Sequence, residues 1–316
     1  VDSCCQGWQR SQLKSMDTYN ESDLLEWCKA VLGPVEMLAD HSREHPGDRT
    51  STYRLRTDSG ICYLKVHNDP AHWHNEVHGY RAWAGAFGPN APRLLAVRDK
   101  APLALVVTAL PGQILDEVRL PAIQEQKVWQ EAGKALAVLH KSATGAFFGP
   151  CREDGRPAGA VVTDAQVYIG AELESWQRRG EAIGCLTPDE MAIVAGASSL
   201  LPAFAGEKPI PCHRDYGPAN WLVTKEGVWS GVIDFEFAQW DVRMADFTRY
   251  PNWEWIDRPD LIEAFHTGYG RAFTPAEESQ RLVCHVLYSL AAVVWGQENA
   301  YFGFAAKGRR ALARLR

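Results

Sequence analysis

The sequence predicts an α+β protein with two lobes, a small N-terminal β-sheet lobe with one key helix and a larger, mainly helical C-terminal lobe. The first third of the chain alternates short runs of β-branched and aromatic residues with turn residues, as strands and hairpins do. Long stretches with apolar residues at helical spacing dominate the rest. Pro111 and Gly112 end the last predicted strand of the first region and mark the boundary between the two regions. We therefore expect an N-terminal lobe over residues 16–110 and a C-terminal lobe over residues 111–316.

The N-terminal lobe is predicted to begin with a helix and to continue with strands. Apolar positions at helical spacing favour a helix over residues 20–32, which Gly33 and Pro34 end. Two strands joined by the turn "DSG" follow, then a helix capped by Asp69 with Pro70 at its first position, and then two more strands. These later elements are expected at residues 50–57, 61–68, 71–87, 93–99 and 103–110.

The C-terminal lobe is predicted to be helical around one hairpin. Residues 121–143 form a long amphipathic pattern, and a polar, glycine-rich region follows to about residue 165. Further helices are expected near residues 165–180 and 188–205. The hairpin consists of "WLVT", the turn "KEG" and "VWSGVIDF", and helical periodicity resumes at about residue 258.

Composition and charge argue against several classes of protein. The chain has 316 residues, of which 46% are hydrophobic and 23% charged, and its formal net charge is −6. This acidic balance disfavours nucleic-acid binding, and no apolar run has the length of a membrane span. We expect a cytoplasmic monomer or homodimer with no nucleic-acid and no membrane partner. Residues 1–15 lack a signal-peptide pattern and are interpreted as a leader or upstream remnant.

The eight cysteines are scattered and form neither a CxxC pair nor a zinc-type cluster. Several lie in apolar runs, where free cysteine behaves as a small hydrophobic residue, so we expect reduced thiols and no structural metal. A nucleophilic role for Cys212 is an alternative, although the motif that begins at the next residue has a better explanation. Four histidines could suggest a metal site, but no cysteine or carboxylate cluster supports it. They are His67, His72, His74 and His78.

The stretch "PCHRDYGPANWLV" places several polar groups directly before an apolar run. It matches the H-R-D-x-x-x-x-N catalytic loop of protein kinases letter for letter, at His213, Arg214, Asp215 and Asn220. The hairpin that follows ends in an acidic residue, Asp234, where kinases carry a second metal-binding aspartate. The loop and the hairpin together favour a phosphotransfer site over an ordinary surface turn.

Two upstream residues extend the match to the N-terminal lobe. Lys65 lies in the strand "CYLKV", at the expected place of a phosphate-binding lysine, and Glu76 lies on the next helix, where its partner is expected. Lys65 as an ordinary edge-strand lysine and Glu76 as a solvated helix residue are the alternatives. The match implies that Lys65 binds the nucleotide phosphates, because phosphoryl transfer depends mostly on positioning and electrostatic stabilisation.

The same match implies roles for the three polar groups of the C-terminal lobe. Asn220 and Asp234 would supply oxygen ligands to Mg²⁺, a hard cation. Asp215 would accept a hydrogen bond from the substrate hydroxyl and orient it for in-line attack. His213 is expected to support the loop through hydrogen bonds and not to act as a base.

Further segments resemble the aminoglycoside phosphotransferase and choline kinase family, a branch of the protein-kinase-like fold. "IDFEFAQWDVRMADFTR" resembles the family's ID-x-E…D segment, with Asp246 expected to hold the catalytic loop. "ALAVLHKS" resembles its helix that ends in Leu-His, here Leu139 and His140, and "LVVTALPGQIL" resembles its hinge. No activation loop follows, and "DFE" replaces D-F-G. The resemblance spans roughly residues 45–250 and implies the bilobal kinase-like fold and phosphotransferase activity.

The resemblance also implies a nucleotide site for ATP or GTP. "HPGDRTSTY" stands where protein kinases have a glycine-rich loop, and Gly47, Ser51 and Thr52 are candidate phosphate neighbours. The hinge would read the base mainly through backbone groups of Thr108, Ala109 and Leu110. Because those groups are common to every residue type, the choice between ATP and GTP stays open.

The acceptor is expected to be a small molecule with a hydroxyl group, bound by the helical lobe. Aromatic faces stack on rings and attract cations, and carboxylates suit a polycation. The candidate substrate-binding residues are Glu236, Trp253, Glu254, Trp255, Asp257 and Trp295. Glu236 could instead support the metal ligands or be merely solvated, and any of the tryptophans could belong to the core.

These residues favour phosphorylation of an antibiotic of the aminoglycoside or the nucleoside type, such as capuramycin, which would confer resistance. A metabolic kinase for choline, homoserine or a sugar is the second hypothesis. A catalytically inactive kinase-like binding protein is the third, and the complete set of Lys65, Asp215, Asn220 and Asp234 argues against it.

Overall fold

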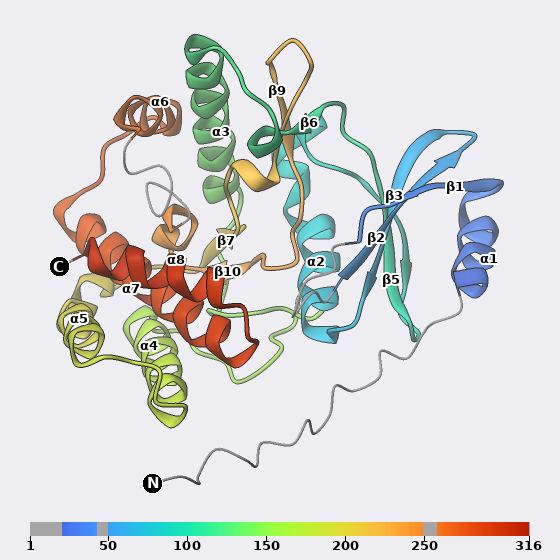
Figure 1. The fold of residues 1–316 in the computed structure, drawn as a ribbon. Coiled ribbons are helices and arrows are strands. Elements are labelled where there is room, and N and C mark those ends of the chain that lie inside the picture. Colours follow the sequence, from blue (N-terminus) through green and yellow to red (C-terminus); the bar gives the residue numbers. More distant parts are fainter. Residues whose placement is uncertain (1–20, 43–49, 249–257, 316) are drawn as a thin grey trace, which may run out of the picture.

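The computed structural model describes residues 21–42, 50–248 and 258–315, and Figure 1 shows that they form two lobes. The N-terminal lobe is a five-stranded antiparallel sheet in the order β1-β2-β3-β5-β4. Its strands are β1 (Val35–Asp40), β2 (Thr50–Thr57), β3 (Gly60–His67), β4 (Leu94–Arg98) and β5 (Leu103–Thr108). The predicted hairpin is confirmed, with Thr57 paired to Gly60 at its turn.

The two faces of this sheet pack against different helices because side chains alternate along a strand. Helix α1 (Glu21–Leu32) covers one face, where Leu24 contributes to a core with Leu64 and Val66. Helix α2 (Pro70–Ala82) lies on the other side, where Trp73 and Val77 share a core with Leu105 and Val107. Lys65 lies between Leu64 and Val66 on β3, so the alternation directs it toward α2.

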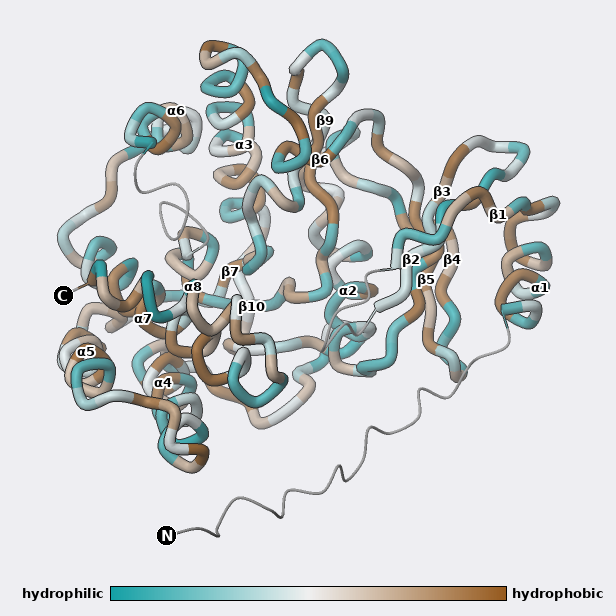
Figure 2. The backbone as a smooth tube through the Cα atoms, viewed as in Figure 1, coloured by the Kyte–Doolittle hydropathy of each residue, from teal (hydrophilic) through white to brown (hydrophobic). Residues whose placement is uncertain are grey.

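The helical lobe consists of α3 (Ala122–Ser142), α4 (Ala165–Ala182), α5 (Pro188–Ser199), α6 (Pro259–Tyr269), α7 (Pro275–Glu298) and α8 (Phe302–Ala313). Figure 2 shows hydrophobic segments concentrated where these helices meet. Helices α3 and α6 approach closely through glycines, since a Cβ on Gly133 would lie 2.1 Å from the carbonyl oxygen of Phe265. Among the described helices, none has the length and hydropathy of a membrane span.

Short strands tie the helical lobe to the centre of the molecule. Strand β7 (Ile210–Cys212) pairs with β10 (Gln239–Asp241), and β8 (Trp221–Val223) pairs with β9 (Trp229–Val232) and with β6 (Gln113–Ile114). Strand β6 joins this sheet directly after Gly112, whose φ is 116° and whose Cβ would lie 2.2 Å from the Val223 carbonyl oxygen. We therefore propose residues 16–110 and 111–316 as the two lobes.

Several predicted elements end earlier than expected, and four strands were not predicted. The helix expected over 71–87 ends at Ala82, and a 3₁₀ segment follows at Ala84–Asn90 with Pro89 near its end. The helix expected over 188–205 ends at Ser199 before another 3₁₀ turn that contains Pro202. The unpredicted strands are β1, β6, β7 and β10, which have at most six residues. Such short segments do not show a clear alternation of apolar and polar residues in the sequence.

Candidate active site

The loop between β7 and β8 brings Asp215 and Asn220 to the edge of the helical lobe. The side-chain Nδ2 of Asn220 donates to the backbone oxygen of Asp215 at 2.9 Å, which fixes the orientation of the amide. The carbonyl of Asn220 accepts from the backbone N–H of Ile233 at 3.0 Å. Because Asp234 follows Ile233, this bond places the two proposed metal ligands on adjacent strand ends.

Asp246 holds the loop from below, which confirms its expected structural role. Its Oδ2 accepts from the backbone N–H of His213 at 2.9 Å, and its Oδ1 accepts from that of Arg214 at 2.5 Å. His140 lies 2.9 Å from Oδ2 through its Nε2 atom. Burial alone would raise the pKa of Asp246, but the hydrogen bond to His140 and the loop contacts hold it below its usual value. Asp246 is therefore a buried carboxylate that keeps its charge.

His213 and Cys212 serve the packing of the same loop. His213 Nε2 lies 3.0 Å from the carbonyl oxygen of Ile233, as expected for a supporting group. The Cys212 thiol is buried and contacts the carbonyl oxygen of Val242 at 3.4 Å, and burial raises its pKa well above the usual value. A protonated, buried thiol is a poor nucleophile, so the structure disfavours the nucleophilic alternative for Cys212.

Two residues of the candidate site adopt left-handed backbone conformations. Arg214 has φ of 64° and Asp234 has φ of 72°, although neither is glycine. Such strain persists only where the surroundings hold it in place, and it concentrates at functional sites. The Arg214 guanidinium forms an ion pair with the buried Asp241, with 3.0 Å between Nε and Oδ2. Asp241 was not predicted, because it contacts Arg214 only through the pairing of β7 with β10.

The ion pair predicted between Lys65 and Glu76 is present and includes a third group. Lys65 Nζ lies 2.5 Å from Glu76 Oε1 and 2.8 Å from Asp234 Oδ1. Glu76 is fully buried, and Asp69 caps the helix that carries it by accepting from the Ala71 N–H. Burial alone would lower the pKa of Lys65, but Asp234 and then Glu76 raise it well above the usual value. Lys65 therefore remains an ammonium group at the meeting point of the lobes.

Glu236 lies on the nucleotide-lobe side of this cluster. Its Oε2 accepts from the Thr50 hydroxyl of β2 at 3.0 Å. Burial and the neighbouring Asp234 raise the pKa of Glu236 to about 8. Among the described residues, His72 of α2 is a basic neighbour, with its Nδ1 4.0 Å from the same oxygen. These contacts with the N-terminal lobe favour a role beside the metal ligands over acceptor binding.

Ser51 and Thr52 lie on β2 and Thr108 ends β5, the two strands that flank the strand of Lys65, and Ala109 and Leu110 follow Thr108 directly. Thr52 on β2 pairs with Lys65, and Ser51 pairs with Val66. At the hinge, the backbone N–H groups of Thr108 and Ala109 donate to the carbonyl oxygens of Arg93 and Ile61. Both N–H groups are therefore already hydrogen-bonded within the N-terminal lobe. The Leu110 N–H has no backbone hydrogen bond within the described part of the chain, and we propose it as the hinge donor for a base.

Of the predicted acceptor residues, Glu236 and Trp295 belong to the described part of the chain. Trp295 packs against Tyr301 and Phe304 where α7 turns into α8, with ring centroids 6.2 Å and 5.7 Å away. This packing makes Trp295 part of a local aromatic cluster. The remaining predicted positions lie outside the described residues, and they are Gly47, Trp253, Glu254, Trp255, Asp257 and the leader 1–15.

Three of the four clustered histidines have neighbours other than a metal site. His74 forms an ion pair with Glu153, and His78 packs edge-on against Trp83. Within the described residues, two groups of potential metal donors occur, and neither contains His72, His74 or His78. The fourth histidine, His67, belongs to one of these groups, together with Glu76 and Glu236.

The donor atoms of Asn220 and Asp234 fit a hard divalent cation such as Mg²⁺. The Asn220 amide donates through Nδ2, which leaves its oxygen as an acceptor. Asp234 uses Oδ1 for Lys65, and its other oxygen has no hydrogen bond among the described groups. A carboxylate oxygen and an amide oxygen are both ligand types that bind Mg²⁺.

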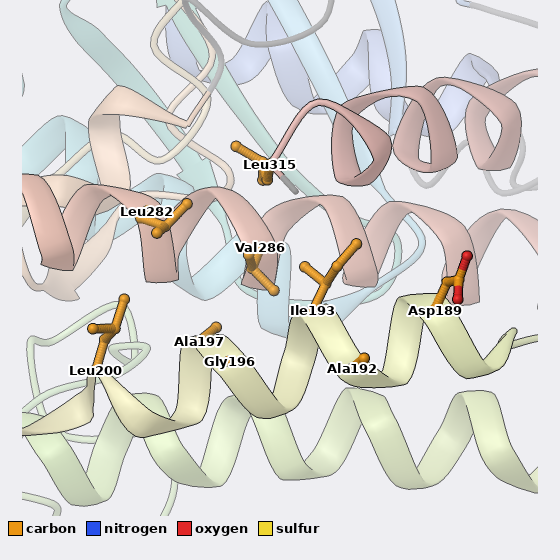
Figure 3. Close-up of a pocket in the computed structure, with 9 residues that line it drawn as sticks. All are labelled: Asp189, Ala192, Ile193, Gly196, Ala197, Leu200, Leu282, Val286 and Leu315. Atoms are coloured by element: carbon orange, nitrogen blue, oxygen red, sulfur yellow. The ribbon is translucent and has the colours of Figure 1, made fainter.

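A separate hollow lies on the helical lobe and is not part of this site. Figure 3 shows it between α5 and α7, and its volume is about 530 Å³. It is lined by Asp189, Ala192, Ile193, Gly196, Ala197, Leu200, Leu282, Val286 and Leu315. The lining is apolar except for Asp189, the only charged residue in it. The hollow therefore lacks the combination of cationic and metal-binding groups that phosphoryl transfer requires.

The two-lobed fold, with Lys65 in contact with Glu76 and Asp234, is that of a kinase-like phosphotransferase. The chain belongs to the phosphotransferase enzyme family, whose sequence model matches residues 41–280. Homoserine kinase of Phenylobacterium zucineum (strain HLK1) is 29% identical over 265 residues, which cover 78% of this chain and 75% of that protein.

Solved structures share the fold at lower identity. Aminoglycoside phosphotransferase APH(4)-Ia has a TM-score of 0.70 and 18% identity, over 94% of this chain and 98% of that chain. A thermostable mutant of it in a ternary complex with AMP-PNP and hygromycin B gives 0.70 and 18%, over 93% and 97%. The gentamicin–APH(2″)-IIa complex gives 0.63 and 15%, over 92% and 95%.

Proposed function

We propose that this phosphotransferase moves the γ-phosphoryl group of a purine nucleoside triphosphate, ATP or GTP, to a hydroxyl group of a small molecule, with Mg²⁺ as cofactor. The observation that carries the proposal is the contact of Lys65 with both Glu76 and Asp234, beside the loop of Asp215 and Asn220. This arrangement joins a cation for the phosphates to oxygen ligands for the metal.

Each of these side chains has one task in the proposed reaction. Lys65 binds the nucleotide phosphates, and Glu76 keeps its ammonium group in place. Asn220 and Asp234 hold Mg²⁺, which neutralises charge on the phosphates when it is bound. Asp215 accepts a hydrogen bond from the acceptor hydroxyl and orients its oxygen for in-line attack.

The first candidate acceptor is a hydroxyl-bearing antibiotic, of the aminoglycoside or the nucleoside type, and the enzyme would then confer resistance. The sequence of residues 250–260, rich in tryptophan and carboxylates, supports this candidate. Structural neighbours that bind hygromycin B or gentamicin share only the fold at their level of identity.

The second candidate acceptor is homoserine. The specific observation in its favour is the match to a homoserine kinase, which is more similar in sequence to this chain than the antibiotic enzymes named above. Choline and simple sugars belong in the same comparison as further small hydroxyl compounds.

An acceptor panel separates these candidates. Purified protein with Mg²⁺ and either ATP or GTP is incubated with homoserine, choline, a hexose, hygromycin B, gentamicin and a capuramycin-type nucleoside, and each product is examined by mass spectrometry. An antibiotic acceptor predicts phosphorylated drug and growth protection of cells that carry the gene. Phosphohomoserine without drug modification would support the metabolic kinase, and nucleotide binding with no transfer to any acceptor would support the inactive binding protein.

We further propose a cytoplasmic enzyme that works as a monomer or homodimer. The six described cysteines are all free thiols, and five of them are buried, which is compatible with a reducing compartment. Analytical ultracentrifugation of the purified chain measures the oligomeric state, and a trimer or larger assembly would contradict the proposal.

A further inference from the structure

His67 is a buried polar residue on the same face of β3 as Lys65. The two residues are separated by Val66, so the alternation of the strand directs both side chains toward α2. The His67 side chain is fully buried and lies next to the likewise buried Glu76. A buried imidazole needs hydrogen-bond partners, because an unpaired polar group in the interior is costly.

His67 Nε2 faces the second oxygen of the Glu76 carboxylate. Nε2 lies 2.7 Å from Glu76 Oε2, while Lys65 occupies the other oxygen, Oε1. This is an ion-pair distance without the angles of a hydrogen bond, and neither Nε2 nor Oε2 has a hydrogen-bonding partner among the described residues. Because an ionised carboxylate can only accept, so close an approach is favourable only when Nε2 carries a proton.

The other ring nitrogen of His67 continues the chain toward the opposite lobe. Nδ1 lies 3.3 Å from the hydroxyl oxygen of Thr50, the residue that pairs with His67 across β2 and β3. The Thr50 hydroxyl also contacts Oε2 of Glu236 at 3.0 Å. Glu236 follows Asp234 by two residues and belongs to the C-terminal lobe. A line of polar contacts therefore runs from Glu76 through His67 and Thr50 to Glu236.

A metal ion is a weaker explanation of this cluster than a set of shared protons. His67, Glu76 and Glu236 do place one potential ligand atom each within 4.8 Å of one another. However, the Lys65 ammonium lies 2.5 Å from the same Glu76 carboxylate, and a second cation beside it would be repelled. A proton on Nε2 would account for its 2.7 Å approach to Oε2 without a metal ion.

We propose that His67 is a positioning residue for phosphoryl transfer, which holds the Glu76 carboxylate so that Lys65 faces the nucleotide, and that Thr50 connects this support to Glu236 across the lobes. The inference rests on the proposed function of Lys65. It adds a buried support that the kinase-type motifs do not contain.

The support acts through the geometry of Glu76. Without the close contact to Nε2, the buried Glu76 Oε2 faces no cationic or polar group of His67, and the carboxylate can rotate away from Lys65. Lys65 then loses one of its two partners and is held mainly by Asp234, the proposed metal ligand. We therefore expect weaker binding of the nucleotide–Mg²⁺ complex and slower transfer.

The test compares His67→Leu with His67→Gln. Glutamine can place its Nε2 donor near the position of the ring Nε2, whereas leucine offers no donor at similar size. Affinity for AMP-PNP with Mg²⁺ is measured by calorimetry, and the KM for nucleotide and for acceptor by steady-state kinetics. We expect at least about a tenfold loss in nucleotide affinity for H67L, a smaller loss for H67Q, and an unchanged acceptor KM.

A second pair of variants tests the connection through Thr50. Thr50→Val removes the hydroxyl at nearly constant volume, while Thr57→Val makes the same exchange at the other end of the same strand, away from the cluster. T50V should lower nucleotide affinity by several-fold and T57V should not. Thermal unfolding of all variants measures their stability. A folding defect would weaken the binding of nucleotide and acceptor equally, whereas loss of the proposed contact should weaken nucleotide binding alone.

Coupling to Glu76 decides whether His67 acts as proposed. In a Glu76→Gln background, His67→Leu should cause little further loss of nucleotide affinity, because the carboxylate that it supports is gone. Fully additive losses, or an H67L enzyme that binds AMP-PNP like the wild type, would overturn the inference. If Lys65→Met also binds AMP-PNP like the wild type, the proposed function of the site fails as well. Loss in K65M with normal binding in H67L removes only the role of His67.

Discussion

The ammonium nitrogen of Lys65 lies 2.8 Å from Oδ1 of Asp234, although the two residues are 169 positions apart and belong to different lobes. The sheet of the N-terminal lobe presents the lysine, and the hairpin of the C-terminal lobe presents the aspartate. We expect the nucleotide and its metal ion to bind between the two lobes. This ion pair should therefore contribute both to the stability of the fold and to the proposed nucleotide site.

Replacing Lys65 should weaken both stability and nucleotide binding. Lys65→Met leaves Glu76 and Asp234 without their shared cation, and removing one partner of a buried ion pair costs about 3–5 kcal/mol. Urea unfolding should show this loss, and calorimetry should show weaker AMP-PNP binding. Lys134→Met is the control, because Lys134 pairs with Glu131 on the surface and should change stability by less than about 1 kcal/mol. An unchanged urea midpoint for K65M would contradict the buried ion pair.

Replacing Asp246 should disturb the catalytic loop without removing a group that touches substrate. Asp246→Asn puts an amide where two backbone N–H groups and His140 require an acceptor. We expect a loss of about 2–3 kcal/mol in unfolding free energy and a fall in kcat that exceeds any change in nucleotide KM. Asp99→Asn, at an exposed position directly after β4, is the control for the same exchange. Equal behaviour of the two variants would show that the loop does not depend on Asp246.

Two helix glycines should respond to alanine in opposite directions. A Cβ on Gly268 of α6 would lie 1.8 Å from the Gln130 carbonyl oxygen of α3, so Gly268→Ala must separate the helices. A Cβ on Gly196 of α5 would meet no neighbouring atom within 4 Å, and Gly196→Ala should stabilise the helix by about 0.5–1 kcal/mol. Thermal unfolding measures both. A stabilised G268A would mean that α3 and α6 are less closely packed than described.

Stability should fall in mild acid because of buried histidines. His285 contacts the Phe247 carbonyl oxygen through Nε2 at 2.6 Å, and burial lowers its pKa to about 4. In the unfolded chain a histidine titrates near pH 6.5, so the unfolded state binds more protons between about pH 6.5 and 4. This contribution is therefore fully present above pH 6.5 and lost as the pH falls through 4.

The variant His285→Gln tests that pH dependence, because glutamine keeps a donor but does not titrate. Unfolding free energies are measured in urea at pH 7 and pH 5 for both proteins. The wild type should lose more stability over this interval than H285Q. Parallel losses would assign the acid sensitivity to other groups, among them His140, whose pKa burial also lowers.

The sequence predicted the elements whose signals are local. The hairpin of β2 and β3 and the helix capped by Asp69 follow from alternation, turn residues and capping, which act over a few residues. The pairing of Lys65 with Glu76 could be predicted because a known motif relates a strand to the next helix. The end of α2 at Ala82 was missed, since the 3₁₀ turn after it contains apolar residues that extend the helical pattern.

The supports of the site could not be predicted, because they depend on contacts between distant segments. Asp241 reaches Arg214 only when β10 pairs with β7, and Thr50 reaches Glu236 only when the lobes meet. The four histidines looked alike in the sequence, yet only His67 lies against Glu76. Trp295 stood out as an aromatic residue, and its local packing in the α7–α8 turn was not visible from the sequence.

The most direct test of the central claim is phosphoryl transfer by the purified chain and by its Asp215→Asn variant, followed by ³¹P NMR with nucleotide, Mg²⁺ and the acceptor that the panel identifies. The account predicts a new phosphate-monoester signal for the wild type. For D215N it predicts a rate lower by about 10²–10⁴-fold, with AMP-PNP affinity unchanged. A D215N enzyme that transfers phosphate at the wild-type rate would contradict the account.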